Sequence, residues 1–400
     1  MYQNLAVLGA FVFLYSSVAA RLERTSINGA LVFVFVGLAF GPLGLGLLNL
    51  SVDEEGLRTL AELTLALVLF TDAANSDLSV LRSNIAIPRR LLLIGLPLTI
   101  LLGFALGFLM FDQLGLIEIA VLATMLAPTD AALGKAVVTN EAVPSRIRQG
   151  LNVESGLNDG ICVPILFLFL ILATQTVGEQ GNHLLALKLV AEEIGIGVAV
   201  GVVLTLAGAW TLKESAARGW VTESWRQVCV PALALACFAT AQYLGGSGFI
   251  ACFVGGMLFG WRAAQRKHAL LLAAEGTGDT LAMLTWVVFG AGAVANSLGS
   301  FGWNVVLYSA LSLTVIRMLP VFIAMTGMGL RLDEKLFIGW FGPRGLASIV
   351  FAVIVLNEHL PGGDTITMTV VCTITLSVLA HGLSANPLVA LLARRIKQGS

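Results

Sequence analysis

Long apolar stretches separated by short polar segments run along the whole chain. Apolar runs of about 17 to 25 residues are long enough for a helix to cross the hydrocarbon of a bilayer. The pattern predicts thirteen membrane spans, over residues 3–20, 28–50, 59–76, 90–111, 114–138, 150–174, 194–212, 228–245, 247–261, 278–298, 303–328, 336–356 and 364–383. Before the seventh span, Lys188 and Glu192 lie one helical turn apart and predict a separate amphipathic helix over residues 182–193.

Two of the spans contain a proline beside an ionisable side chain. The fifth reads Ala-Pro-Thr-Asp-Ala from residue 127, and the twelfth reads Gly-Pro-Arg-Gly-Leu from residue 342. Proline removes a backbone donor and clashes with the preceding turn, so both spans should unwind locally. Unwound backbone at membrane depth persists only where protein or a water-filled cavity surrounds it. Interrupted helices that carry charges are typical of the substrate site of a secondary transporter.

Composition agrees with a membrane protein. The chain is 57% hydrophobic and only 12% charged, with a mean hydropathy of +0.91. A soluble fold of 400 residues could not bury that much apolar surface. The 43 glycines allow transmembrane helices to approach closely. A net charge of −1 gives no electrostatic basis for a nucleic-acid partner.

The basic residues alternate between the two sides of the predicted membrane protein. Lys and Arg accumulate on the cytoplasmic side, and the odd-numbered loops together with the C-terminal end hold most of them. These are Arg21, Arg24, Arg82, Arg89, Arg90, Arg146, Arg148, Lys213, Arg218, Arg226, Arg262, Arg266, Lys267, Arg331, Lys335, Arg394, Arg395 and Lys397. We therefore expect a multi-pass protein of the cell inner or plasma membrane, with its N-terminus outside and its C-terminus in the cytoplasm. The first span lacks a basic segment before it and is expected to stay uncleaved.

The position of the interrupted spans suggests an internal repeat. The fifth and twelfth spans are each the fifth member of a six-span block when residues 194–212 form the connector. The blocks, about 1–175 and 226–393, would enter the membrane from opposite sides, as inverted repeats do. We expect one all-α membrane domain over residues 1–400, with two inverted six-helix repeats, crossing discontinuous helices and no soluble regulatory domain.

The sixth span carries a polar stripe. On a helix, Glu154, Ser155, Asn158 and Asp159 fall within about 140° of one face. The stripe has no His or Cys for zinc and no base for a serine nucleophile. Its oxygen ligands suit a hard cation such as Na⁺ or Li⁺. Because a carboxylate in low-dielectric surroundings can bind a proton once the cation has left, one acid can carry both in turn.

Two arginines within spans require counter-ions. Arg317 lies well inside the eleventh span and Arg344 at the break of the twelfth. A charge at the bilayer centre costs about 2.5 to 3.5 kcal/mol, so each should be paired or functional. The four histidines are near loops or span ends and are expected at the surface, these being His183, His268, His359 and His381.

These motifs together resemble the NhaP-type monovalent cation/proton antiporters of the CPA1 family, which are related to the animal sodium/proton exchangers. The resemblance rests on Pro128-Thr129-Asp130, on Glu154-Ser155 with Asn158-Asp159, on Pro343-Arg344-Gly345 and on Leu69-Phe70-Thr71-Asp72-Ala73, and covers nearly the whole chain.

The resemblance implies roles for these residues. Asp159 would carry the cation and the proton, with Asp130 as its partner where the two interrupted helices cross. Thr129 and Ser155 would offer oxygens to the ion, and Asp72 would be an acid that approaches it from the third span. Glu154 would pair with Arg317, and Arg344 would offset helix-dipole ends and Asp130. Asn158 before Asp159 resembles the pair found in electroneutral members.

The sequence therefore predicts a secondary antiporter that exchanges Na⁺ or Li⁺ for H⁺ by alternating access. We expect the exchange to be electroneutral and one-for-one, in a homodimer embedded in lipid. A K⁺/H⁺ exchanger on the same scaffold is the alternative, followed by a cation channel or sensor. A channel would need a continuous pore, whereas two crossing breaks favour an occluded site. An enzyme is not expected, because no nucleophile and base lie together in the spans, and neither is a cofactor.

Overall fold

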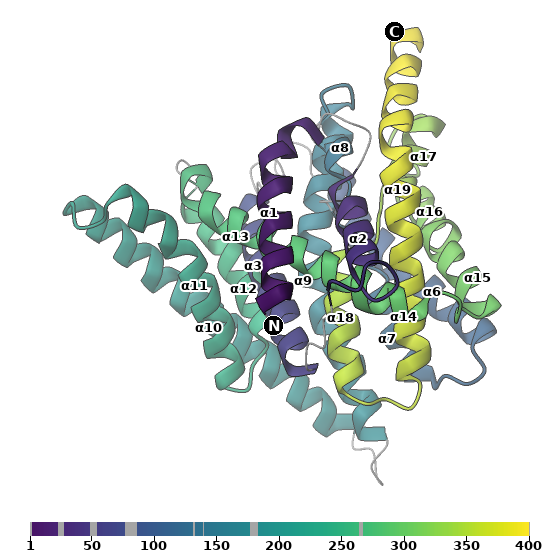
Figure 1. Cartoon of the computed structure of the whole chain (residues 1–400), viewed down its shortest axis with the longest axis horizontal. Coiled ribbons are helices and arrows are strands. Elements are labelled where there is room, and N and C mark those ends of the chain that lie inside the picture. Colours follow the sequence, from purple (N-terminus) through teal and green to yellow (C-terminus); the bar gives the residue numbers. More distant parts are fainter. Residues whose placement is uncertain are drawn as a thin grey trace. The chain divides into compact units, whose positions relative to one another are not determined.

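The computed structural model describes residues 2–22, 28–48, 54–76, 86–130, 133–138, 140–176, 183–263 and 267–399, which are mostly helical and contain no strand (Figure 1). The first half of the chain contains α1 (Tyr2–Leu22), α2 (Gly29–Phe40), α3 (Glu54–Asn75), α5 (Ala86–Arg90), the π-helix η1 (Leu91–Gly95), α6 (Leu96–Met110), α7 (Leu116–Met125), α8 (Lys135–Val138), α9 (Ser145–Thr176) and α10 (His183–Ala217). The second half contains α11 (Glu223–Tyr243), α12 (Gly248–Arg262), α13 (Lys267–Val288), the π-helix η2 (Phe289–Val294), α14 (Ala295–Ser297), α15 (Trp303–Leu313), α16 (Val315–Ala324), α17 (Leu332–Trp340), α18 (Leu346–Asn357) and α19 (Gly363–Gly399).

Helices lie at all thirteen predicted spans, so the all-α fold class is confirmed. Within the described residues, seven helices are long and apolar enough to cross a membrane, and four shorter apolar helices accompany them. Two of the shorter helices, α7 and α18, are segments of the interrupted spans. The sequence placed both interruptions correctly, since the described residues 126–130, 133–134 and 341–345 are not helical.

Two predicted elements have different bounds in the structure. The second span is helical only to Phe40, because Pro42 disfavours helical geometry at Gly41, and turns follow. The separate amphipathic helix predicted over residues 182–193 is wrong, because α10 runs without a break from His183 to Ala217. No proline interrupts this segment, so one helix continues through it. Lys188 and Glu192 do form an exposed ion pair of 3.6 Å on it.

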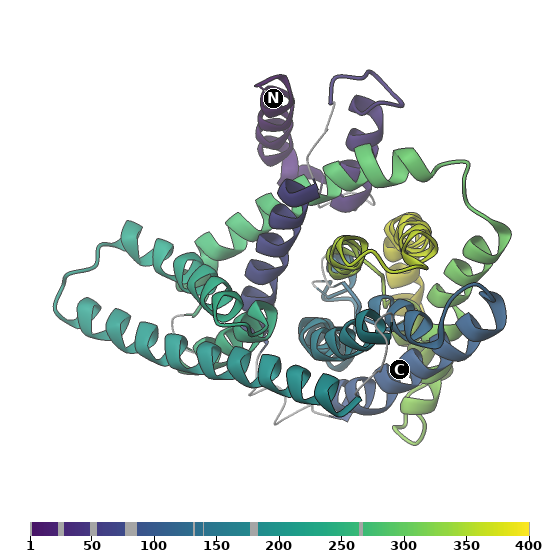
Figure 2. The ribbon, with the colours of Figure 1, turned by 90° about the horizontal axis from the view of Figure 1, so that it is seen from below.

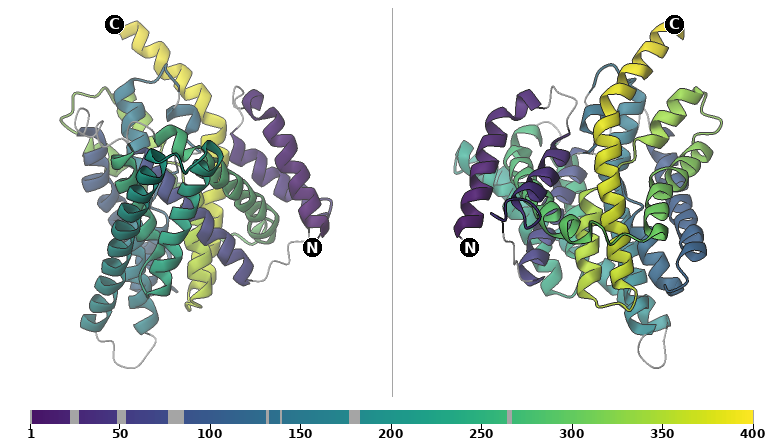
Figure 3. Two further views of the ribbon diagram at one scale, coloured as in Figure 1. Left: turned by 90° about the vertical axis from the view of Figure 1, so that its left-hand side faces the viewer. Right: turned by 45° about the vertical axis from the view of Figure 1, so that its right-hand side comes forward.

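The chain divides into two compact units. The first comprises Met1–Arg58, Asn84–Ser155 and Ala282–Ser400, and the second Thr59–Ser83 and Gly156–Leu281. In the first unit α19 packs along α15 and α18, and α6 packs on α7; the length of α19 is clear in Figure 3. Glycines bring α2 against η2, since an added Cβ at Gly37 or Gly290 would collide with the carbonyl of Val287 or Val34.

The second unit is held by close helix contacts of the same kind. Its α10 contacts α11 and α12, and Figure 2 shows α10 and α11 as long neighbouring helices joined by a loop. Gly256 and Gly260 lie one turn apart on α12. An added Cβ at these positions would collide with the carbonyls of Phe70 and Ala74 on α3. This small-xxx-small spacing lets the backbones of α3 and α12 approach closely.

Candidate functional site

The two interrupted helices meet inside the first unit. The backbone N–H of Asp130, in the break after α7, donates to the carbonyl of Pro343, in the break after α17, at 2.8 Å. The prolines interrupt helical hydrogen bonding in both segments. Here a backbone N–H of one break donates to a backbone carbonyl of the other. The contact brings together residues more than 200 positions apart in the chain.

Asp130 lies at the first turn of α18. Its Oδ2 accepts the N–H of Leu346 at 2.9 Å, and its Oδ1 accepts the N–H of Leu133 at 3.3 Å. The start of a helix carries free N–H groups and a partial positive charge, which stabilise a carboxylate. Gly345 is required for this approach, because a Cβ at that position would overlap the Asp130 carboxylate.

Arg344 places a positive charge just after the C-terminal end of α7. Its buried guanidinium donates through Nη1 to the carbonyls of Ala127 and Pro128, at 2.6 and 3.0 Å. The hydroxyl of Ser348 donates to the carbonyl of Met125 at 2.7 Å. A cation is favourable at the C-terminal end of a helix. The crossing therefore places a carboxylate where α18 begins and a guanidinium where α7 ends.

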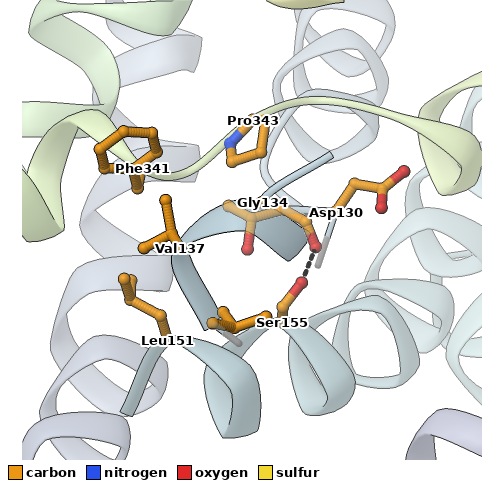
Figure 4. A pocket seen from close by; sticks show the side chains of 9 residues that line it. Asp130, Gly134, Val137, Leu151, Ser155, Phe341 and Pro343 are labelled. Carbon is orange, nitrogen blue, oxygen red and sulfur yellow. Dashed lines mark hydrogen bonds between the residues drawn. The ribbon is translucent and has the colours of Figure 1, made fainter. Parts of the chain in front are cut away.

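A small pocket opens beside this crossing (Figure 4). Its lining is formed by Thr129, Asp130, Gly134, Val137, Val138, Leu151, Ser155, Phe341 and Pro343. The hydroxyl of Ser155, on α9, donates to the Thr129 carbonyl at 2.5 Å. The Ser155 hydroxyl and the Thr129 carbonyl that it binds are oxygen atoms of residues that line the pocket, and Val137, Leu151 and Phe341 form an apolar side of it. Oxygen donors of this type suit hard cations.

Glu154 precedes Ser155 on α9 and binds Arg317. Arg317 Nη1 and Nη2 donate to the two carboxylate oxygens of Glu154 at 2.6 and 2.8 Å. The sequence had predicted this partner. The two side chains are 2% exposed or less, and a Cβ at Gly342 would overlap the Arg317 guanidinium. The bidentate geometry is that of a strong, fully desolvated ion pair.

Asn158, Asp159 and Asp72 belong to the second unit. Asn158 and Asp159 are buried on α9, and Asp72 is half-buried near the end of α3. Gly156 brings these two helices close, because a Cβ there would lie 2.9 Å from Ser76 Oγ and 3.4 Å from the carbonyl oxygen of Asp72. The roles of Asp159 as carrier, and of Asn158 and Asp72 beside it, stay predictions.

The expectation of a surface position for His381 is wrong. Its side chain is fully buried and bonds to Ser377 and to the carbonyl of Trp340. His359 is exposed as expected, whereas the side chains of His183 and His268 lie outside the described residues. A signal was present, since Ser377, His381 and Ser384 form a polar stripe of helical spacing in an apolar span.

Comparison with known proteins identifies the family. The profile of the transmembrane sodium/hydrogen exchanger matches residues 7–391. The chain belongs to this family. Its members are transporters.

Relatives and a solved structure resemble this chain along its length. A K(+)/H(+) antiporter NhaP2 of Shewanella oneidensis is 25% identical over 95% of this chain, and the chain spans 64% of that relative's length. A Na(+)/H(+) antiporter of Schizosaccharomyces pombe is also 25% identical, over 96% of this chain and 89% of its own. The sodium proton antiporter MjNhaP1 from Methanocaldococcus jannaschii shares the fold, with a TM-score of 0.78, 20% identity and 98% coverage of both chains.

Proposed function

We propose that this exchanger moves a monovalent cation in one direction and H⁺ in the other, through one site that opens alternately to the two sides of a membrane. The observation that carries the proposal is the crossing of interrupted helices in the first unit. There Leu346 binds Asp130 and Arg344 binds the carbonyls after α7. Crossing half-helices with exposed backbone at mid-span are the ion sites of many secondary transporters. Membership of the exchanger family supports the same activity.

Each residue of the site has a distinct task in this proposal. Asp159 carries either the cation or the proton, and Asp130 is its partner acid. The oxygens of Thr129 and Ser155 help to replace the water of the arriving ion. Asn158 orients the site through its amide, and Asp72 contributes a further acid from α3. Arg344 offsets the charge of Asp130 and the end of α7, while the Glu154–Arg317 pair holds α9 against α16.

Competition couples the two fluxes. A carboxylate that has bound a proton cannot bind Na⁺ at the same time, so each transition between the two access states carries one or the other. The exchange is one-for-one and electroneutral if Asp159 is the only carrier, as the neutral neighbour Asn158 suggests.

The second candidate cargo is K⁺. It is favoured by the Shewanella relatives, which are named K(+)/H(+) antiporters, whereas the fission yeast relative of equal identity is named a Na(+)/H(+) antiporter. Na⁺ or Li⁺ is the main proposal, because carboxylate, hydroxyl and carbonyl oxygens are the ligands that hard cations prefer. A cation channel or sensor would use the same pocket without obligatory exchange, and cation movement without a counter-movement of protons would reveal a channel.

The arrangement in the membrane is part of the proposal. The exchanger lies in the cell inner or plasma membrane with its N-terminus outside and its C-terminus in the cytoplasm, because basic residues accumulate in the odd-numbered loops. Its repeats are residues of about 1–175 and 226–393, joined by 194–212, and it works as a homodimer in the bilayer.

The test is cation-dependent proton movement in proteoliposomes. The purified chain is reconstituted with an acidic interior and a pH-sensitive dye, and Na⁺, Li⁺ or K⁺ is added outside. We expect Na⁺ and Li⁺ to dequench the dye in the wild type and not in Asp159→Asn. A response to K⁺ alone would establish the second candidate. No response to any of the three ions would refute cation/proton exchange.

A further inference from the structure

The break between α17 and α18 is held at both ends by one neighbouring helix. Trp340 is the last residue of α17, and its carbonyl oxygen lies 2.9 Å from Nε2 of His381 on α19. Arg344 is at the other end of the break, and its backbone N–H donates to Ser377 Oγ, also on α19, at 2.8 Å. Helix ends leave such carbonyls and amides without intrahelical partners. Ser377 and His381 supply those partners from one face of α19, one turn apart.

The two α19 side chains also contact each other. His381 Nδ1 lies 3.2 Å from the hydroxyl oxygen of Ser377 and 3.0 Å from its carbonyl oxygen. Each ring nitrogen of His381 thus faces a backbone carbonyl, Nδ1 that of Ser377 and Nε2 that of Trp340. Trp340 is held once more through its indole N–H, which donates to Ser384 Oγ at 2.9 Å. Ser377, His381 and Ser384 therefore form a polar stripe along the break.

The atoms that this stripe holds are next to those that contact Asp130. Arg344, fixed through its backbone by Ser377, also places its guanidinium on the carbonyls of Ala127 and Pro128. Leu346, two residues further on, binds the Asp130 carboxylate. Five non-helical residues, 341–345, separate α17 from α18. They have many backbone conformations of similar energy unless something outside the break selects one.

We infer that Ser377 and His381 are positioning residues for ion exchange, which fix the conformation of the α17–α18 break and through it the geometry of Asp130 and Arg344. Neither touches the transported ion. The inference rests on the proposed function, because it names the residues that hold the proposed site in its binding geometry. Loss of either should weaken cation binding more than it slows the transport cycle, since the binding oxygens are displaced while the moving helices stay intact.

The test compares three variants with a matched control. Ser377→Ala removes the acceptor of the Arg344 N–H, and His381→Leu removes both ring nitrogens. His381→Gln is the conservative variant, because its amide places a donor near the position of Nε2. The control is Thr375→Val, because Thr375 is on the same helix and half-buried, and its hydroxyl donates to the carbonyl of Val371 within that helix.

We expect Ser377→Ala and His381→Leu to raise the cation concentration for half-maximal exchange about tenfold, equivalent to about 1.4 kcal/mol. The maximal rate should stay within about twofold of the wild type. His381→Gln should recover most of the affinity, and Thr375→Val should keep all of it. Hydrogen exchange followed by mass spectrometry should show faster exchange of the peptide that contains Arg344 in the first two variants only.

Two results would overturn the inference. One is unchanged affinity and unchanged hydrogen exchange in folded Ser377→Ala and His381→Leu protein; the other is an equal effect of Thr375→Val. A wild type that exchanges no cation would refute the proposed function instead. In that case the hydrogen-exchange comparison alone decides whether α19 fixes the break.

Discussion

Arg317 binds both carboxylate oxygens of Glu154, and the pair is sealed from solvent between α16 and α9. An ion pair of this kind gives little net stability relative to apolar residues, but removing one partner leaves a buried charge without compensation. Gly342 allows the Arg317 guanidinium to lie directly against the α17–α18 break. The pair therefore joins the α9 helix, which carries the predicted ion carrier, to the backbone around the site.

The first prediction concerns this pair. Glu154→Gln or Arg317→Met alone should lower stability by about 3 to 5 kcal/mol, and the double variant should lose less than the sum. Melting temperatures of the purified proteins measure this. The exposed Lys188–Glu192 pair is the control, because breaking a surface pair costs only about 0 to 1 kcal/mol. Additive losses would show that Glu154 and Arg317 do not act together.

A second prediction concerns Gly345. Gly345→Ala should abolish or strongly reduce exchange, because its Cβ would overlap the Asp130 carboxylate and push it from the first turn of α18. Gly276→Ala, where an added Cβ meets nothing within 4 Å, should behave as the wild type. Transport assays on both variants test this. Normal exchange by Gly345→Ala would mean that Asp130 does not need its contact with Leu346.

The carrier acid gives a third prediction. Asp159→Asn should stop exchange, since an amide cannot alternate between a proton and a cation. The protein should still fold, because Asn has nearly the same size as Asp and burying a charge was itself unfavourable. Melting temperature and size-exclusion profile serve as the control for folding. Cation-driven proton movement by purified Asp159→Asn protein would disprove the assignment.

The stoichiometry gives a fourth prediction. If one H⁺ is exchanged for one cation at Asp159, no net charge crosses the membrane. A potential imposed on Na⁺/H⁺ exchange with K⁺ and valinomycin should then leave the final ion gradients unchanged. A shift of those gradients with potential would require a second titrating carrier.

The fifth prediction concerns pH. Protons and cations compete for one carboxylate, so exchange should slow as the pH falls on the side where the cation binds. Raising the cation concentration should restore the rate, because competition changes the half-saturating concentration and not the maximal rate. A fall in maximal rate that extra cation does not reverse would indicate a separate inhibitory proton site.

Much of this molecule follows from the sequence alone. Apolar runs located helices at all thirteen predicted spans, because burial of backbone polar groups in a bilayer leaves helix as the local solution. Pro128 and Pro343 located both interruptions, because the effect of proline on its own turn is local. The family resemblance paired Glu154 with Arg317, and the cost of an unpaired charge at membrane depth had shown that Arg317 needs a counter-ion.

Only the tertiary structure decided which groups form hydrogen bonds with the backbone of the two interrupted segments. Nothing local indicates that Asp130 binds Leu346, that Arg344 reaches the carbonyls of Ala127 and Pro128, or that His381 is buried against Trp340. These contacts join segments far apart in the chain, and each depends on which helix packs beside the exposed backbone. The sequence determines where backbone groups lose their helical partners, because that is set within a single turn. Which distant side chains replace those partners depends on the packing of the whole unit.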